Sequence, residues 1–144
     1  MHARPKFFSV EAANRTLPLV RRIVRDIVNA YPDFQRRLEA FHNLAASPHA
    51  PDARQRLETL RIEIDRDARL INGFIQELHQ IGCLFKGFEE GLVDFYSLYR
   101  GRPILLCWKL GEERIAHWHE VDAGFAGRQP LTPDIIADIR AHLR

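Results

Sequence analysis

The sequence predicts an α+β fold in which a long antiparallel helical hairpin packs on a small four-stranded antiparallel sheet, followed by a short C-terminal helix. Over residues 9–81 apolar residues recur in steps of three and four, the spacing of amphipathic helices. Over residues 82–122 the pattern changes to alternation, which is typical of strands. Residues 123–144 form a loop and then a helix start, Thr132-Pro133-Asp134. We expect the 144 residues to form a single domain.

The composition is that of an ordinary globular protein, with 46% hydrophobic residues, 28% charged residues and a net charge of +2. The longest apolar run, residues 104–108, is far shorter than the roughly 20 residues of a membrane helix. The first residues, MHARPKFFS, lack the apolar core of an export signal. Nucleic-acid binders usually carry a larger, clustered basic excess. We therefore expect a cytoplasmic protein that binds neither membranes nor nucleic acid.

The first predicted helix begins after Ser9, a good N-cap, with Glu11 in its first turn, where the helix dipole favours an acid. Pro18 and Pro32 lie inside the helix, and each removes a backbone hydrogen bond. Because the apolar stripe stays in register past both prolines, we predict one kinked helix. The stripe consists of Leu17, Val20, Val24, Ile27, Tyr31, Phe34, Leu38 and Phe41.

A loop at residues 46–52 separates this helix from a second one over residues 53–80, and Gly82 follows as a C-terminal cap. The second stripe consists of Leu57, Leu60, Ile64, Asp67, Ile71, Phe74, Leu78 and Ile81. Asp67 is the one charged residue in the two stripes. Since a buried unpaired carboxylate costs several kcal/mol, we expect Asp67 either to meet the Tyr31 hydroxyl or to point outward.

Four strands are expected at residues 84–88, 92–98, 104–109 and 114–120, joined by short turns. Strands so close in sequence pair as an antiparallel meander. The third strand is almost entirely apolar, which favours a central place in the sheet. We expect the helical hairpin to lay its apolar face across this sheet, because a small sheet alone would leave one face bare.

The segment His117-Trp118-His119-Glu120-Val121-Asp122 concentrates potential metal ligands. On a strand, His117 and His119 point to the same side, and Asp122 shares their parity. Glu120 points to the other side unless the strand ends there. Asp94, in the middle of an apolar strand, requires a partner. Two histidines and a carboxylate are the ligand set of many zinc and non-haem iron sites. The same residues could instead be exposed, be hydrogen-bonded without a metal, or act as an acid and base.

The loop Gly124-Phe125-Ala126-Gly127-Arg128 suggests a second kind of site. Its glycines allow close backbone approach, and Arg128 together with Arg102 could hold a carboxylate or phosphate. The alternative is a tight loop with a solvated arginine.

The two cysteines, Cys83 and Cys107, are too few and too far apart for a CxxC pair. We expect free, buried thiols. Cys107 could pair with His117 or His119 as a nucleophile and base, but no sequence pattern indicates an oxyanion hole.

Four blocks of the sequence resemble a known family: FSVEAANRTLP at residues 8–18, GLVDF at 91–95, LCWKLGE at 106–112 and WHEVDAGFAGRQPL at 118–131. Their order and spacing are similar to the bacterial domain-of-unknown-function family DUF2203 over nearly the whole chain. The resemblance implies no activity or cofactor. The family pattern commonly has proline where this chain has Tyr96, and often tyrosine at the position of His117. It therefore implies that His119, Asp94 and Asp122 are better ligand candidates than His117.

Two functions follow as hypotheses. The first is a divalent-metal site (zinc, iron or manganese) or small-anion site in the C-terminal half. Its residues are His119, Asp122, Glu120, His117 and Asp94, with Arg128 and Arg102 as anion contacts. The second is a non-catalytic interaction module whose helical hairpin forms a homodimer or binds a partner. Two unbroken apolar stripes carry more apolar area than one small sheet covers.

Overall fold

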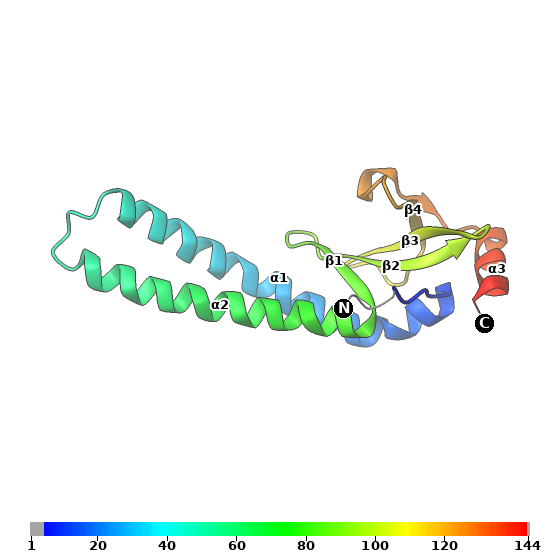
Figure 1. Cartoon of the computed structure of the whole chain (residues 1–144), viewed down its shortest axis with the longest axis horizontal. Coiled ribbons are helices and arrows are strands. Elements are labelled where there is room, and N and C mark those ends of the chain that lie inside the picture. Colours follow the sequence, from blue (N-terminus) through cyan, green and yellow to red (C-terminus); the bar gives the residue numbers. More distant parts are fainter. Residues whose placement is uncertain (1–4, 144) are drawn as a thin grey trace.

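The computed structural model describes residues 5–143 and confirms the α+β class (Figure 1). In chain order the elements are α1 (Val10–Ala46), α2 (Ala53–Ile81), β1 (Cys83–Gly87), β2 (Leu92–Tyr99), β3 (Arg102–Lys109), β4 (His117–Glu120), the 3-10 turn η1 (Phe125–Gly127), β5 (Gln129–Pro130) and α3 (Pro133–His142). Part of the N-terminal segment in which we expected no export signal, residues 1–4, lies outside the described residues. Within residues 5–143, no helix combines the length and apolar character needed to cross a membrane.

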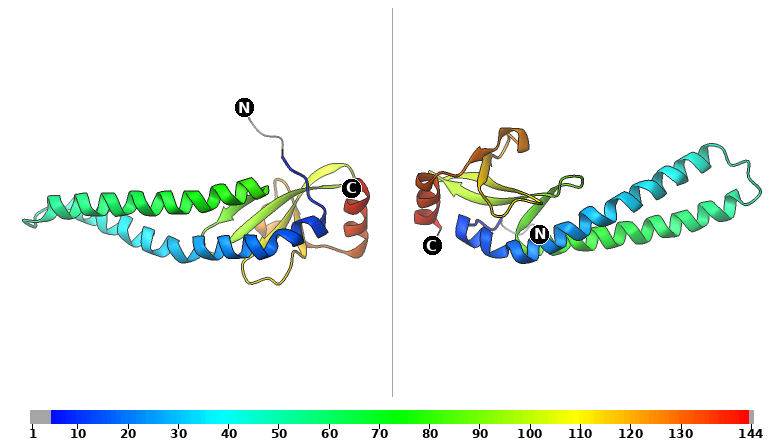
Figure 2. Two further views of the ribbon diagram at one scale, coloured as in Figure 1. Left: turned by 90° about the horizontal axis from the view of Figure 1, so that it is seen from below. Right: turned by 180° about the vertical axis from the view of Figure 1, so that it is seen from behind.

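Helix α1 is continuous through Pro18 and Pro32, which confirms one helix rather than two. The Ser9 hydroxyl caps its start by accepting a hydrogen bond from the Ala12 amide at 3.1 Å. Both prolines are exposed, so water can replace the backbone hydrogen bonds that they remove. The helix curves along its length (Figure 2). Helix α2 ends as predicted at Gly82, which has a left-handed φ of 112°.

Asp67 follows neither of the two alternatives expected from the sequence. Its Oδ2 accepts a hydrogen bond from Nη1 of Arg37 at 2.6 Å, so an arginine of the opposite helix compensates the charge. Tyr31 instead stacks its ring on Phe88, with the ring centroids 4.4 Å apart. The expectation missed Arg37 because this arginine lies beside the apolar stripe rather than on it.

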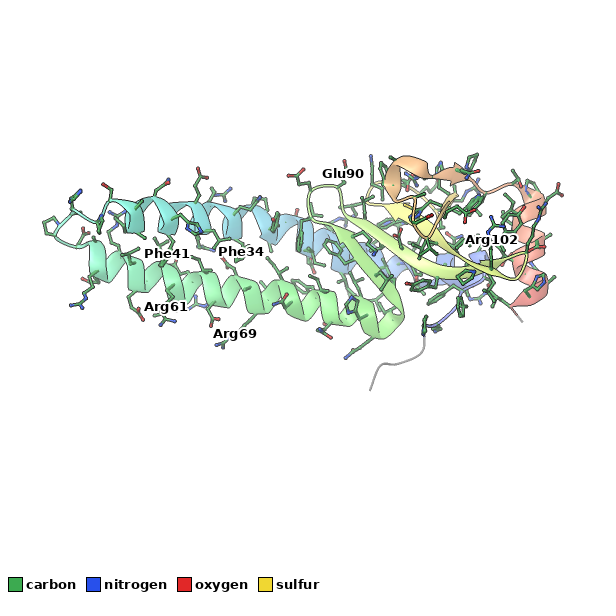
Figure 3. All side chains as sticks on the ribbon, turned by 45° about the horizontal axis from the view of Figure 1, so that its top comes forward. Phe34, Phe41, Arg61, Arg69, Glu90 and Arg102 are labelled. Atoms are coloured by element: carbon green, nitrogen blue, oxygen red, sulfur yellow. The ribbon has the colours of Figure 1, made fainter. Side chains whose placement is uncertain are left out.

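The hairpin covers the sheet with only its near half. The buried residues of α1 end at Ile27, and the far half of the hairpin extends beyond the sheet (Figure 1). Figure 3 shows Phe34 and Phe41 between the two helices and Arg61 and Arg69 pointing away from α1. Our expectation that the hairpin lies across the sheet therefore holds for its near half alone. In the far half, the two helices pack mainly against each other.

The sheet is a meander in the order β1-β2-β3-β4-β5, with five strands rather than the predicted four. The added strand β5 pairs with β4 in a segment that we expected to be loop. Two residues are too few to show alternation, which is why the pattern did not reveal it. Strand β4 begins at His117, three residues later than predicted. Helix α3 begins as predicted, because the Thr132 hydroxyl accepts a hydrogen bond from the Ile135 amide.

The two faces of the sheet have different roles. One face carries the apolar residues Val93, Phe95, Ile104, Leu106, Trp108 and Trp118, which share a core with α1. Antiparallel pairing puts Asp94 opposite Cys107 and Leu105 opposite His119. Since paired residues share a face and neighbours along a strand alternate, these four side chains lie on the opposite face. The predicted alternation of side chains after Gly82 is confirmed for β2, β3 and β4.

Candidate metal centre

Three side chains that can bind a metal ion converge on the face of the sheet opposite α1. They are Asp94 on β2, Cys107 on β3 and His119 on β4, one from each of three adjacent strands. One potential ligand atom of each lies within 4.8 Å of the other two. All three residues are almost fully buried, with exposures of 4%, 1% and 2%. A carboxylate, a thiol and an imidazole held this closely form a compact group of three ligands.

The turn between β2 and β3 sets this register. Arg100 and Gly101 have positive φ values of 52° and 75°, as in the two-residue turns that match the twist of a hairpin. With Tyr99 paired to Arg102, the pairing runs back along the hairpin to Asp94 and Cys107. His119 is paired with Leu105 rather than with Cys107, so its side chain approaches Cys107 and Asp94 diagonally across the strands.

Two contacts, one to a backbone oxygen and one to a side chain, fix the orientation of the His119 ring. Its Nδ1 lies 2.7 Å from the backbone oxygen of Glu120, and its Nε2 lies 3.2 Å from Oδ1 of Asp94. Because a carbonyl oxygen only accepts, Nδ1 must carry a hydrogen and donate it. In the neutral ring, Nε2 then keeps its lone pair and directs it into the cluster. A backbone carbonyl on the far nitrogen is the usual partner that orients a metal-binding histidine.

Burial determines the protonation of the other two groups. It raises the pKa of the Asp94 carboxyl, while the nearby His119 and Lys86 act in the opposite direction. Burial, followed by the negative charge of Asp94, raises the pKa of the Cys107 thiol to about 12. At neutral pH the metal-free protein therefore holds a protonated thiol. A divalent cation would reverse both effects, because it stabilises the thiolate and the carboxylate together.

The cluster lies in a pocket of about 260 Å³. This volume is below the roughly 300–1,000 Å³ of pockets for drug-sized ligands, so the space suits a small molecule or a few waters. One wall comes from the segment between β4 and η1. The lining residues are Lys86, Leu92, Asp94, Leu105, Cys107, His119, Val121, Gly124 and Phe125.

The structure does not bring the other predicted metal ligands into this cluster. His117 shares the sheet face, but its Nδ1 lies 3.6 Å from Oε2 of Glu112 and has no hydrogen-bond partner among the described residues. Glu120 forms an ion pair with Arg102. Asp122 is exposed in the turn after β4, where the strand parity that we used no longer applies. Of the five predicted ligands, the cluster contains His119 and Asp94.

Both arginines proposed as anion contacts already have acidic partners. Arg102 pairs with Glu120, and Nη2 of Arg128 lies 2.9 Å from Oε1 of Glu112. Burial alone would raise the pKa of Glu112, but hydrogen bonds from Arg128 and from the Lys109 amide outweigh it and the pKa is lowered. These arginines are therefore committed to ion pairs outside the pocket.

Sequence reasoning did not select two of the residues that line this pocket, Cys107 and Lys86, as site residues. Cys107 was interpreted as a small buried hydrophobe, and both cysteines are indeed free and buried. Its place beside Asp94 depends on the register, which the turn at Arg100 and Gly101 would have indicated. Lys86 gave no signal, because one lysine in a short strand usually marks a solvent-facing position. Lys86 is indeed exposed, and it also lines the rim of the pocket.

Fold and cluster together define an α+β protein with a helical hairpin and a buried Asp–Cys–His group that could bind a metal ion. The chain belongs to a conserved family whose function is not characterised: the family model described as "Uncharacterized conserved protein (DUF2203)" matches residues 6–131. The match confirms the resemblance drawn from the four sequence blocks and includes all three residues of the cluster. No curated protein and no solved structure matches the chain.

Proposed function

We propose that Asp94, Cys107 and His119 bind one zinc ion, with the fourth coordination position facing the pocket. The observation that carries the proposal is the convergence of their three ligand atoms within 4.8 Å in a buried site. Zinc bonds of about 2.3 Å to sulfur and about 2.0–2.1 Å to nitrogen place tetrahedral ligand atoms roughly 3.3–3.8 Å apart. The 3.2 Å between Nε2 of His119 and Oδ1 of Asp94 is already close to this spacing. The remaining separations, none above 4.8 Å, need to shorten by roughly 1 Å at most to hold the ion.

The chemistry of the donor set favours zinc over the other candidate metals. A thiolate and an imidazole are softer ligands than the oxygen donors that manganese prefers, and divalent zinc generally binds a given site more tightly than iron(II) does. Three protein ligands and one open position are typical of catalytic rather than structural zinc sites. Zinc in such a site lowers the pKa of a bound water to about 7, which would give the pocket a hydroxide at neutral pH.

Charge balance supports the same proposal. Without a metal, the pocket holds a buried carboxyl beside a thiol and an imidazole, and ionising the carboxyl or the thiol is costly. With zinc, the two charges of the ion match one thiolate and one carboxylate. A hydrogen-bonded His119–Asp94 pair without metal is the competing interpretation, and it assigns no role to the thiol of Cys107.

The test is the zinc affinity of protein purified without an affinity tag, measured by competition with a chromophoric chelator. We expect one zinc per chain in the wild type and a loss of about a hundredfold or more in affinity for Cys107→Ser and for His119→Ala. Cys83→Ser is the matched control, because Cys83 is equally buried and free but lies on the core face. Equal zinc binding by the wild type and Cys107→Ser would overturn the proposal.

We propose as a second function that the far half of the hairpin associates with a second copy of the chain. The supporting observation is that the stripe beyond Ile27 is only half-buried, with Phe34, Leu38, Phe41 and Leu57 each partly exposed. Two such hairpins could bury these residues together as a four-helix bundle.

Sedimentation equilibrium tests this association. We expect a dimer that Leu38→Glu weakens and that Leu19→Glu does not. Leu38 belongs to the half-buried stripe of the far half, whereas Leu19 is an exposed apolar residue on the near half of α1. A monomer at every accessible concentration would remove the second function and leave the metal centre unaffected.

A further inference from the structure

Lys86 is the one basic side chain among the residues that line the pocket beside the cluster. It lies at an irregularity in β1, where the pairing with β2 shifts between Phe85 and Gly87. Such bulges re-aim a side chain relative to the regular alternation of a strand. Within residues 5–143, no ion pair involves Lys86, in contrast to Arg102 and Arg128. Its ammonium group is therefore available to a ligand.

The charges of the loaded pocket do not cancel. Zinc bound by the Cys107 thiolate, the Asp94 carboxylate and the neutral His119 ring carries no net charge. The ammonium group of Lys86 then leaves the pocket with one positive charge. A ligand with one negative charge would neutralise it, by occupying the open position of the metal and accepting hydrogen bonds from Lys86.

The remaining walls of the pocket are apolar. Leu92 and Leu105 form the wall on the sheet side, and Val121 and Phe125 form the wall on the loop side. Val121 and Phe125 keep exposures of 49% and 36%, although apolar side chains of this size are more often buried. A short hydrocarbon group between these walls would cover both of them. The volume of about 260 Å³ limits that group to a few carbons.

We infer that the pocket binds a small aliphatic carboxylate, with its carboxylate group between the metal ion and Lys86 and its hydrocarbon tail against Leu105, Val121 and Phe125. The inference rests on the proposed metal centre and names the class of ligand that the centre takes. Lys86 selects for negative charge, and the apolar walls select for a short tail.

The experiment uses the full chain loaded with cobalt(II), whose visible absorption bands report changes in coordination. The cobalt protein is titrated with butyrate and, separately, with butyramide, a neutral molecule of nearly the same shape. Each titration is repeated with Lys86→Met and with Arg54→Met. Arg54 is an exposed basic residue at the far end of the hairpin, so its variant loses the same charge outside the pocket. The cobalt affinity of every variant is measured alongside.

We expect butyrate to change the cobalt bands to saturation and to bind about tenfold or more tightly than butyramide. Lys86→Met should weaken butyrate binding by about tenfold while leaving cobalt affinity unchanged, and Arg54→Met should alter neither. If the protein binds cobalt but butyrate has no effect, or butyramide binds equally well, the carboxylate inference is overturned and the metal centre stands. Failure of Lys86→Met to weaken butyrate binding also overturns it. If the protein binds no cobalt, both the carboxylate inference and the proposed metal centre are overturned.

Discussion

His119 and Asp94 meet across an intervening strand: Nε2 of the histidine on β4 lies 3.2 Å from Oδ1 of the aspartate on β2. Neighbouring strands are about 4.8 Å apart, so the backbones of β2 and β4 are separated by roughly 10 Å at this point. The contact requires a small side chain on β3 between them, and Cys107 fills that position. The thiol is thus placed where two other side chains that can bind a metal ion converge.

Zinc binding should release the proton of the Cys107 thiol. This thiol has a pKa of about 12 in the metal-free protein, so it is protonated at neutral pH and the metal must displace the proton. We expect the zinc affinity to rise about tenfold for each pH unit above neutrality from this group alone. Calorimetric titration in buffers of different ionisation enthalpy measures the released proton. Proton release from Cys107→Ser equal to that from the wild type would contradict the assignment.

Neither cysteine should react readily with thiol reagents in the folded, metal-free protein. Burial raises the pKa of Cys83 and of Cys107 to about 12, which leaves about one part in 10⁵ as thiolate at pH 7. We expect Ellman's reagent to modify both thiols quickly in concentrated guanidinium chloride and only slowly in native buffer. If the native protein reacts fast, and the Cys83→Ser variant reacts equally fast, the reactive thiol is Cys107. That result would support the hypothesis that Cys107 acts as a nucleophile with His117 or His119 as its base.

Asp94→Asn should stabilise the metal-free protein and destabilise the zinc-loaded one. Burial raises the pKa of the Asp94 carboxyl, which means that the folded state holds the proton more tightly than the unfolded chain. The stability from this group is therefore fully present below the ordinary value of 3.8 and is lost as the pH rises through the folded value. In chelator, we expect the stability advantage of Asp94→Asn to grow from acid to neutral pH.

Urea unfolding with and without zinc measures both effects of Asp94→Asn. With zinc present, the variant should lose stability relative to the wild type because it lacks an anionic ligand. In chelator, the stability advantage of Asp94→Asn over the wild type could instead shrink as the pH rises. That result would show that the Asp94 carboxylate stabilises the metal-free protein, and that His119 and Asp94 form a hydrogen-bonded pair without a metal.

Two glycines in turns should respond very differently to alanine. Gly91 has a φ of 70°, and a Cβ there would lie 2.8 Å from the Leu110 Cβ and 2.9 Å from the Val24 Cγ1. Gly101 has a φ of 75° with nothing within 4 Å. We expect Gly101→Ala to cost about 1 kcal/mol from backbone strain alone and Gly91→Ala about 3 kcal/mol, because steric overlap adds to the strain. Equal costs, measured by urea unfolding, would mean that the sheet and α1 pack less tightly here.

The helical hairpin could be predicted because its signal is long. Eight apolar positions in steps of three and four fix a helical face, and this regularity outweighs Pro18 and Pro32. Asp67 was the exception, because its partner Arg37 is outside the stripe that the prediction used. How far the hairpin extends beyond the sheet could not be predicted, since that depends on which half of α1 meets the sheet.

The Asp94–Cys107–His119 cluster could be predicted only in part, because it depends both on the alternation of side chains along each strand and on the pairing register between strands. Alternation along β4 correctly put His119 on one face, but it failed at Asp122, where the strand has already ended. The place of Cys107 beside Asp94 depends on pairing between strands. The short turn at Arg100 and Gly101 specifies that pairing, whereas the longer connection from β3 to β4 leaves the position of His119 to tertiary packing.

X-ray absorption at the zinc edge of the zinc-loaded protein tests the centre most directly, because it counts sulfur and light-atom ligands around the ion. We expect one sulfur at about 2.3 Å together with nitrogen and oxygen ligands at about 2.0–2.2 Å, and loss of the sulfur shell in Cys107→Ser. A shell of nitrogen and oxygen ligands alone in the wild type would show that Cys107 does not bind the ion and would contradict the three-residue centre.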